Sequence, residues 1–209
     1  MILLNDDCFK LLDEISCDII FTSPPYNRKR NDKYTLYDDT IYDYYSFLVH
    51  FIEHAQFRKY LFLNIQTNFY NKKEVYKLIG NYYDFIQQVF IWEKSNPMPA
   101  QGHNITNAFE YIIVFGDKPL KSNTTYTKNI ITTSVNSATT TKMHRAVMKQ
   151  EVADWFIGNF TVEGDVIFDP FMGLGTTGIA CKTYNRDFIG VEINQEYFNI
   201  AQERIEKGA

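Results

Sequence analysis

Short apolar runs alternate along the chain with longer segments in which apolar side chains recur every three or four positions. The short runs predict seven strands, at residues 2–4, 18–22, 60–65, 85–92, 109–115, 166–169 and 188–192. The longer segments predict helices at residues 8–15, 41–55, 72–82, 149–160, 176–184 and 195–207. This alternation is typical of an α/β fold with a mostly parallel seven-stranded sheet and helices on both faces. Ligands of such sheets bind beyond the carboxyl ends of the strands.

Length and composition predict one globular domain over residues 1–209, with ordinary apolar and charged fractions. No apolar run approaches the roughly 18–20 residues that span a bilayer. The N-terminal segment lacks the basic region of a signal peptide. Cys8, Cys17 and Cys181 show no CxxC or Cys/His spacing, and the histidines form no metal-ligand pattern. We therefore expect free thiols, no metal and a cytoplasmic protein.

Charge is unevenly distributed along a chain whose formal net charge is −4. Residues 28–33 carry a net charge of +3 and residues 117–149 a net charge of +5, so the rest of the chain is strongly acidic. Two basic segments on an acidic body form either a phosphate-binding face or two solvated loops. Charge alone does not separate these alternatives.

The segment Ser23-Pro24-Pro25-Tyr26 directly follows the apolar run at residues 18–22. Proline fixes φ and has no backbone N–H, so the turn is stiff and its carbonyls are available as acceptors. The Ser23 hydroxyl and the Pro24 carbonyl are candidate acceptors for an exocyclic amine, and Tyr26 can stack on a base. The alternative is a tight turn with a purely structural role.

A second pattern follows the buried run that ends at Asp169. Gly173 and Gly175 permit a tight turn and a close approach of the backbone to a ligand. Thr176 begins a helix whose N-terminus attracts a carboxylate. The next strand ends at Glu192, where an acidic side chain can accept hydrogen bonds from both hydroxyls of a ribose.

The glycine spacing also satisfies GxGxxG, through Gly173, Gly175 and Gly178, so a nicotinamide-dependent dehydrogenase is one alternative. A dinucleotide fold needs a second mononucleotide-binding half, and few residues follow Glu192. The Pro-Pro-Tyr segment has no role in a dehydrogenase. A third alternative is a catalytically inactive DNA-binding protein of the same fold.

The two patterns together resemble the DNA amino-methyltransferases, which methylate adenine N6 or cytosine N4. The catalytic motif of that family reads Asp/Asn/Ser-Pro-Pro-Tyr/Phe, matched by residues 23–26, and its cofactor motif reads Phe-x-Gly-x-Gly, matched by residues 171–175. The order, catalytic motif first, is similar to that of the permuted beta class. The resemblance implies a Rossmann-like fold, S-adenosylmethionine as cofactor, and double-stranded DNA from which one base is flipped.

The resemblance also assigns roles in the cofactor site. It implies that Asp169 lies near the methionine amino group, that Glu192 binds the ribose and that Asp7 meets the adenine end. His144 and Ala146 would line the methionine pocket. The remaining residues assigned to the cofactor are Phe171, Gly173, Gly175 and Thr176. From the residues themselves, Asp7 is equally interpreted as a helix N-cap and His144 as a solvent-exposed side chain.

The same resemblance implies which base is methylated and which residues contact the DNA. Ser at the first motif position favours cytosine N4, with adenine N6 as the alternative. We expect Arg28, Lys29 and Arg30 to contact phosphates; Asn96 either holds the base or phosphate or belongs to a proline-rich turn. A small target-recognition insertion is expected around residues 117–143. Enzymes of this kind often act as homodimers, and a restriction endonuclease would be encoded separately.

Overall fold

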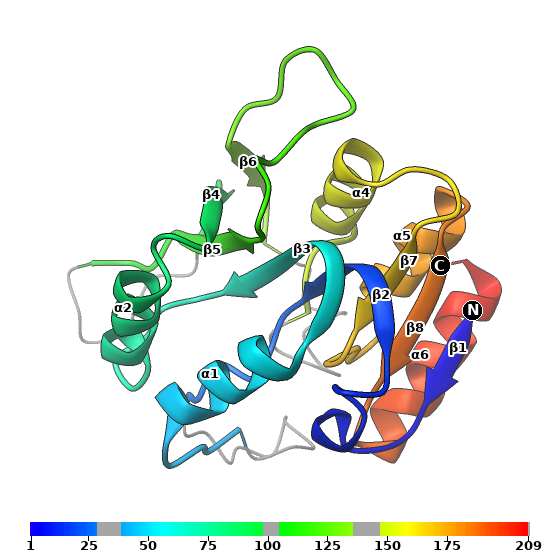
Figure 1. The fold of residues 1–209 in the computed structure, drawn as a ribbon, viewed down its shortest axis with the longest axis horizontal. Coiled ribbons are helices and arrows are strands. Elements are labelled where there is room, and N and C mark those ends of the chain that lie inside the picture. The colour runs from blue at the N-terminus through cyan, green and yellow to red at the C-terminus, as the bar shows by residue number, and fades with distance from the viewer. Residues whose placement is uncertain (29–38, 98–104, 136–146, 209) are drawn as a thin grey trace.

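The computed structural model describes residues 1–28, 39–97, 105–135 and 147–208. The described residues form a single twisted sheet with helices on both faces (Figure 1). The sheet contains β1 (Ile2–Leu4), β2 (Ser16–Thr22), β3 (Gln56–Ile65), β4 (Ile86–Lys94), β5 (Phe109–Phe115), β6 (Ile130–Thr133), β7 (Val166–Asp169) and β8 (Asp187–Val191). Their spatial order is β1-β8-β7-β2-β3-β5-β4-β6, and only β5 runs antiparallel to its neighbours. The α/β class and the mostly parallel sheet are as the sequence predicts.

The described part of the chain has eight strands where the hydrophobic pattern predicts seven. The additional strand, β6, lies at the sheet edge and pairs in parallel with β4. The β-branched residues Ile130 to Thr133 suit a half-buried strand, because Ile131 is buried and its neighbours are more exposed. The hydrophobic pattern predicts no strand at residues 130–133, and the pairing with β4 defines this one.

The helices are η1 (Cys8–Lys10), α1 (Tyr44–His54), α2 (Lys72–Asn81), α4 (Gln150–Phe160), α5 (Thr176–Thr183) and α6 (Gln195–Lys207). Five match the predicted helices within a few residues. The segment predicted as a helix over residues 8–15 is instead a single 3-10 turn followed by further turns. None of the helices in the described part of the chain is long and apolar enough to span a bilayer.

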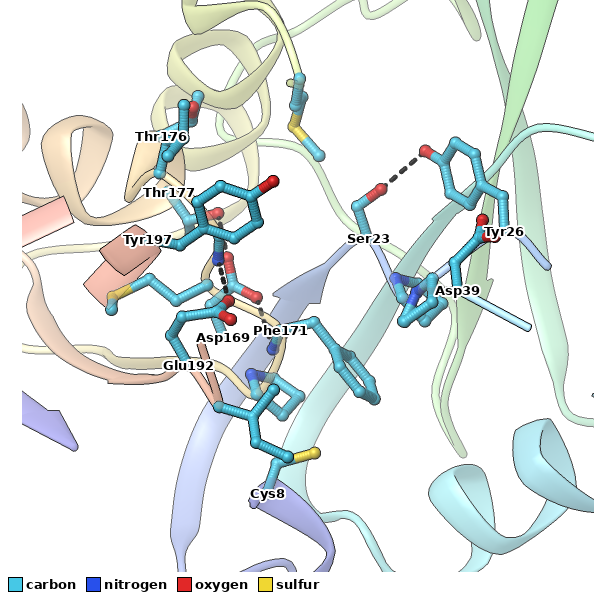
Figure 2. A pocket seen from close by; sticks show the side chains of 18 of the residues that line it. Cys8, Ser23, Tyr26, Asp39, Asp169, Phe171, Thr176, Thr177, Glu192 and Tyr197 are labelled. Atoms are coloured by element: carbon cyan, nitrogen blue, oxygen red, sulfur yellow. Dashed lines mark hydrogen bonds between the residues drawn. The ribbon is translucent and has the colours of Figure 1, made fainter. Parts of the chain in front are cut away.

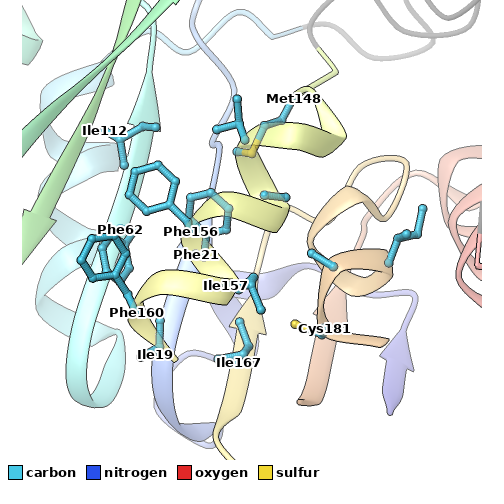
Figure 3. Close-up of a cluster of buried hydrophobic side chains, with 14 of the residues drawn as sticks. Ile19, Phe21, Phe62, Ile112, Met148, Phe156, Ile157, Phe160, Ile167 and Cys181 are labelled. Carbon is cyan, nitrogen blue, oxygen red and sulfur yellow. The ribbon is translucent and has the colours of Figure 1, made fainter. Parts of the chain in front are cut away.

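Alternation of side chains along the central strands divides the core into two layers. Ile19 and Phe21 of β2 point to the layer beneath α4, α5 and α6, where Phe62 and Phe156 also lie (Figure 3). Ile20, between them, points to the opposite layer, beneath α1 and α2. Burial on both faces explains why β2 reads as a continuous apolar run and not as an alternating one.

Candidate active site

The two sequence motifs meet because β2 and β7 are neighbours in the sheet. Ile19 and Ile20 of β2 pair with Ile167 and Phe168 of β7, in parallel. The segments that leave the carboxyl ends of these strands therefore lie side by side. They line one cavity of about 320 Å³, with Ser23 and Tyr26 on one side and the cofactor loop on the other (Figure 2).

Most of the predicted site residues line this cavity. From the catalytic motif they are Ser23, Pro24, Pro25 and Tyr26; from the cofactor site they are Asp7, Asp169, Phe171, Gly173, Thr176 and Glu192; and from the expected phosphate contacts Arg28 lines it as well. The side chains that the sequence did not single out include Asp39, Phe47, Met148 and Tyr197. Lys29, Arg30, His144 and Ala146 lie outside the described residues.

The two motif glycines serve different purposes. Gly173 has a φ of +54° and lines the cavity, and a Cβ there would meet nothing closer than 3.9 Å. Gly175, with a φ of +78°, does not line the cavity; its Cβ would meet Ile205 at 2.9 Å and Ala201 at 3.2 Å. Gly175 therefore allows α5 to begin close against α6, and its assignment to the cofactor stays a prediction.

Asp169 is 4% exposed, and its carboxylate is held by three donors. Oδ1 accepts hydrogen bonds from Thr22 Oγ1 at 2.6 Å and from the Phe171 N–H at 3.2 Å, and Oδ2 accepts one from Thr177 Oγ1 at 2.7 Å. Burial raises the pKa of Asp169 to about 6, opposed by the two threonine hydroxyls. The carboxyl therefore holds its proton to a higher pH than an exposed aspartate does.

Glu192 lies across the cavity from the catalytic motif, at the end of β8. Its Oε2 accepts a hydrogen bond from the Gly173 N–H at 2.8 Å, and Oε1 accepts one from the Asn194 N–H at 2.8 Å. Burial raises the pKa of Glu192, and these backbone donors act in the opposite direction. The carboxylate thus fixes the glycine loop and still lines the cavity.

Asp7 caps a helical turn and also lines the cavity. It is the N-cap of η1, where its Oδ1 accepts a hydrogen bond from the Phe9 N–H at 3.0 Å. It also lines the cavity. Capping and ligand contact are therefore compatible at this residue.

The chemistry of the cavity wall fits S-adenosylmethionine. Two carboxylates, Asp169 and Glu192, suit an ammonium group and a pair of ribose hydroxyls. Thr176 begins α5, whose N-terminus suits a carboxylate. Apolar and aromatic side chains such as Phe171 provide surface for an adenine ring.

The backbone of the catalytic motif is held from outside by three side chains that the sequence did not single out. The Tyr44 hydroxyl of α1 donates to the Pro25 carbonyl at 2.7 Å. The Tyr26 carbonyl accepts from Asn68 Nδ2 at 2.7 Å and from Asn71 Nδ2 at 2.8 Å. The Pro-Pro turn is thus rigid both by its own ring geometry and by these bonds.

A buried polar cluster lies behind Tyr26. Its hydroxyl is 2.6 Å from Ser23 Oγ and 2.9 Å from Glu110 Oε2, and Asn64 and Lys94 complete the cluster. The sequence carried a signal for two of these residues. Glu110 and Asn64 are polar residues inside the apolar runs that form β5 and β3.

Arg28 stands over the Tyr26 ring, with its guanidinium carbon 5.3 Å from the ring centroid. Its Nη2 donates to Gln66 Oε1 at 2.6 Å, and its backbone N–H donates to Asp39 Oδ2 at 2.8 Å. The other oxygen of Asp39 is buried and has no hydrogen-bond partner among the described residues. Asn96 does not line the cavity. Its side chain lies next to the end of β6, where Oδ1 accepts a hydrogen bond from the Val135 N–H at 2.7 Å.

Comparison with known proteins agrees with this arrangement. A family model described as DNA methylase matches residues 17–203. The type II methyltransferase M2.LlaDCHI of Lactococcus lactis is 28% identical, in an alignment that covers 100% of this chain and 90% of that protein. M2.DpnII of Streptococcus pneumoniae is 26% identical, with 99% and 90% covered. The orphan methyltransferase M.BamHII of Bacillus amyloliquefaciens is 45% identical over 30% of this chain and 23% of its own length.

Solved structures show the same fold. The PvuII cytosine-N4-specific DNA methyltransferase superposes with a TM-score of 0.76 at 18% identity, covering 99% of this chain and 90% of that one. The complex of M1.HpyAVI with S-adenosylmethionine superposes with a TM-score of 0.69 at 21% identity, covering 97% and 98%. Both confirm the Rossmann-like architecture.

The chain belongs to the DNA methylase family, as an S-adenosylmethionine-dependent methyltransferase of cytosine N4 or adenine N6. Family membership removes the dehydrogenase alternative. Gly178, the third glycine of the GxGxxG pattern, instead permits close packing, because a Cβ there would meet Ile205 at 2.5 Å and Phe188 at 2.8 Å.

Proposed function

We propose that this enzyme is a site-specific methyltransferase that acts on a flipped base in duplex DNA, with cytosine N4 favoured over adenine N6. The observation that carries the preference is the Ser23 hydroxyl, which lines the cavity where other members of the family have a carboxylate or an amide. Serine at this position is commoner among cytosine-N4 enzymes of the family.

The chemistry required of the residues is modest. An exocyclic amine is a poor nucleophile because its lone pair is delocalised into the ring. Hydrogen bonds from its two N–H groups to Ser23 and to the Pro24 carbonyl favour pyramidal nitrogen and localise the pair. S-adenosylmethionine supplies an electrophilic methyl group on a sulfonium centre. The enclosed cavity holds the base amine in line with that group, and proximity contributes most of the acceleration.

Tyr26 supplies the base platform in this proposal. Its side chain is only 5% exposed, and it forms part of the cavity wall beside Pro25. A ring fixed in this way can stack on a flipped base with little loss of side-chain entropy. A base still paired in a duplex does not reach the floor of such a cavity, which is why we propose flipping.

The cofactor roles are proposed from the same geometry. Asp169 receives the methionine amino group, Glu192 the ribose hydroxyls and Asp7 the adenine end. Phe171, Gly173 and Thr176 form the remaining wall. Each of these residues lines the cavity, which supports the assignment.

The DNA-facing part is proposed from charge and from position. Arg28 borders the cavity, where the DNA backbone must pass if a base is flipped into it. Residues 117–143 are proposed as a small target-recognition insertion in a single domain. The alignment with M2.LlaDCHI runs over 253 positions against 209 residues here, so that relative contains segments that this chain lacks. A small target-recognition segment suits a short recognition sequence. We propose that the enzyme binds this sequence as a homodimer and that any restriction endonuclease is encoded separately.

The deciding experiment is expression in a bacterial host that lacks DNA methylases. Nucleoside mass spectrometry of the host DNA, combined with sequencing that detects modified bases, identifies base, atom and site. N4-methylcytosine at one short sequence supports the proposal. N6-methyladenine would replace the cytosine preference and leave the enzyme class in place. Unmodified DNA, with the purified protein folded and still binding S-adenosylmethionine, would favour the catalytically inactive alternative.

A further inference from the structure

The Tyr26 hydroxyl stands at a branch point of the buried polar cluster behind the catalytic motif. Three oxygens surround it: Ser23 Oγ at 2.6 Å, Glu110 Oε2 at 2.9 Å and Asn64 Oδ1 at 3.3 Å. A phenol has one hydrogen to donate, so it can satisfy only one of these neighbours as a donor. The direction of that hydrogen determines what the Ser23 hydroxyl can do.

Glu110 determines the direction. It is 5% exposed, and its Oε1 lies 2.5 Å from Lys94 Nζ in an ion pair. Its Oε2 accepts from Asn64 Nδ2 at 3.0 Å and faces Tyr26. An ionised carboxylate can only accept, so the Tyr26 hydrogen points to Glu110.

The remaining contacts follow from that assignment. Asn64 Nδ2 is fixed between two acceptors, Glu110 Oε2 and the Tyr111 carbonyl at 3.2 Å, so the amide oxygen of Asn64 faces the hydroxyls. The 2.6 Å contact between Ser23 and Tyr26 then needs a donor, and only the Ser23 hydroxyl remains. Burial, and next the charge of Glu110, hold the pKa of Tyr26 well above its usual value, so the phenol keeps its hydrogen.

We propose that Glu110 is a positioning residue, which acts through the Tyr26 hydroxyl to turn the Ser23 hydrogen away from the cavity and leave the Ser23 oxygen as an acceptor for the target amine. The inference rests on the proposed function, since it assumes that Ser23 accepts from that amine. Glu110 does not line the cavity, so it acts on the target only through Tyr26 and Ser23. The ion pair with Lys94 balances the charge of Glu110.

Tyr26→Phe is the first test. The substitution keeps the ring that lines the cavity and removes only the hydroxyl, so Ser23 loses its preferred acceptor and its hydrogen can turn toward the base. We expect the single-turnover methylation rate at saturating DNA and cofactor to fall about tenfold, with unchanged affinity for S-adenosylmethionine. A hydroxyl with a merely structural role would change the melting temperature and leave the rate.

Glu110→Gln is the sharper test because it reverses the chain of donors. Lys94 attracts the amide oxygen of the new glutamine, which turns the amide NH₂ toward Tyr26. Tyr26 then donates to the nearer of its two remaining acceptors, which is Ser23 Oγ at 2.6 Å and not Asn64 Oδ1 at 3.3 Å, and the Ser23 hydrogen faces the target amine. We expect a rate loss of about a hundredfold, larger than that of Tyr26→Phe.

The double variant Glu110→Gln/Tyr26→Phe distinguishes this account from simple damage. Removal of the misdirected phenol should restore the rate from the level of Glu110→Gln to that of Tyr26→Phe. If the two substitutions act independently, their fold-losses in rate multiply, and the double variant is slower than either single variant. A double variant slower than Glu110→Gln overturns the proposal.

Matched controls lie elsewhere in the chain. Tyr82→Phe removes another tyrosine–glutamate hydrogen bond, to Glu53 at 2.7 Å. Asp165→Asn neutralises another buried carboxylate, paired with Lys59 and remote from the cavity. Both should keep the wild-type rate. If Glu110→Gln fails to fold, a wild-type rate in Tyr26→Phe still overturns the inference. The proposed function fails separately, if the wild type yields no methylated amine.

Discussion

The Thr22 hydroxyl donates to Asp169 Oδ1 at 2.6 Å, which links the last residue of β2 to the last residue of β7 across 147 positions of sequence. One end of this bond belongs to the strand that precedes Ser23, and the other is the carboxylate proposed to receive the methionine amino group. A buried hydrogen bond therefore couples the two motif-bearing strands.

Thr22→Val should test this coupling. The valine keeps the shape of the threonine and leaves a buried carboxylate oxygen short of one donor, which should cost about 1–3 kcal/mol of unfolding free energy. The same loss should raise the pKa of Asp169 further. Urea denaturation measures the first effect, and Thr132→Val, which removes an exposed hydroxyl bonded to Glu93, is the matched control. Equal stability of the two variants would contradict the prediction.

Cofactor binding should depend on pH through Asp169, whose pKa lies at about 6. The ionised carboxylate attracts the methionine ammonium group, so affinity should rise from pH 5 to pH 7 and level off above. Well below the pKa, each pH unit should weaken binding by up to about tenfold. The folding stability of the protein without cofactor should depend on pH in the opposite direction. The folded state binds the extra proton, so stability due to this group falls as pH rises between about 4 and 6.

Calorimetric titration at several pH values measures this dependence. Asp169→Asn should bind more weakly and lose the pH dependence between pH 5 and pH 7. A wild-type affinity that is constant over this range would show that Asp169 does not face the ammonium group.

Glu192→Gln should weaken S-adenosylmethionine binding, because the amide can accept through only one atom while both carboxylate oxygens now accept backbone N–H groups. Loss of charged hydrogen bonds should cost about 1.5–3 kcal/mol in binding free energy. Glu196→Gln, in the first turn of α6, is the control and should bind normally. Unchanged affinity in Glu192→Gln would remove this residue from the ribose site.

Salt dependence should reveal the DNA face. Arg28→Ala should reduce the slope of log affinity against log salt by about 0.9 if the guanidinium contacts one phosphate. Replacement of Lys29 and Arg30 as well should flatten the slope further while cofactor affinity stays the same. Lys207→Ala, on the exposed end of α6, is the control. A slope that survives the triple replacement would identify the segment as a solvated loop.

Ser23→Asp should separate the two base preferences. A carboxylate at this position still accepts from an amine, so some activity should remain, with the product balance shifted from N4-methylcytosine toward N6-methyladenine. Ser23→Ala removes the acceptor and should lower turnover without unfolding the protein. Product analysis by mass spectrometry compares the three proteins. Full activity in Ser23→Ala would remove Ser23 from the mechanism.

The sequence by itself determined the features that depend on neighbouring residues. Apolar runs predicted seven of the strands, because burial on both faces leaves a local composition that can be read directly. The motifs at residues 23–26 and 171–175 were readable for the same reason, since turn geometry restricts which residues fit. The α/β class and the membership of the family followed from these local signals.

Only the tertiary structure decided which residues meet. β6 pairs in parallel with β4 because the edge of that strand is available, which no local pattern of residues 130–133 records. Gly175 packs against Ile205 and Ala201 of α6, since the packing of two helices sets its contacts. Glu110 and Asn64 looked like interruptions of apolar runs. They become partners of Tyr26 because β5 pairs with β3 in a register that places Asn64 opposite Ile112, and strand register is a property of the whole sheet.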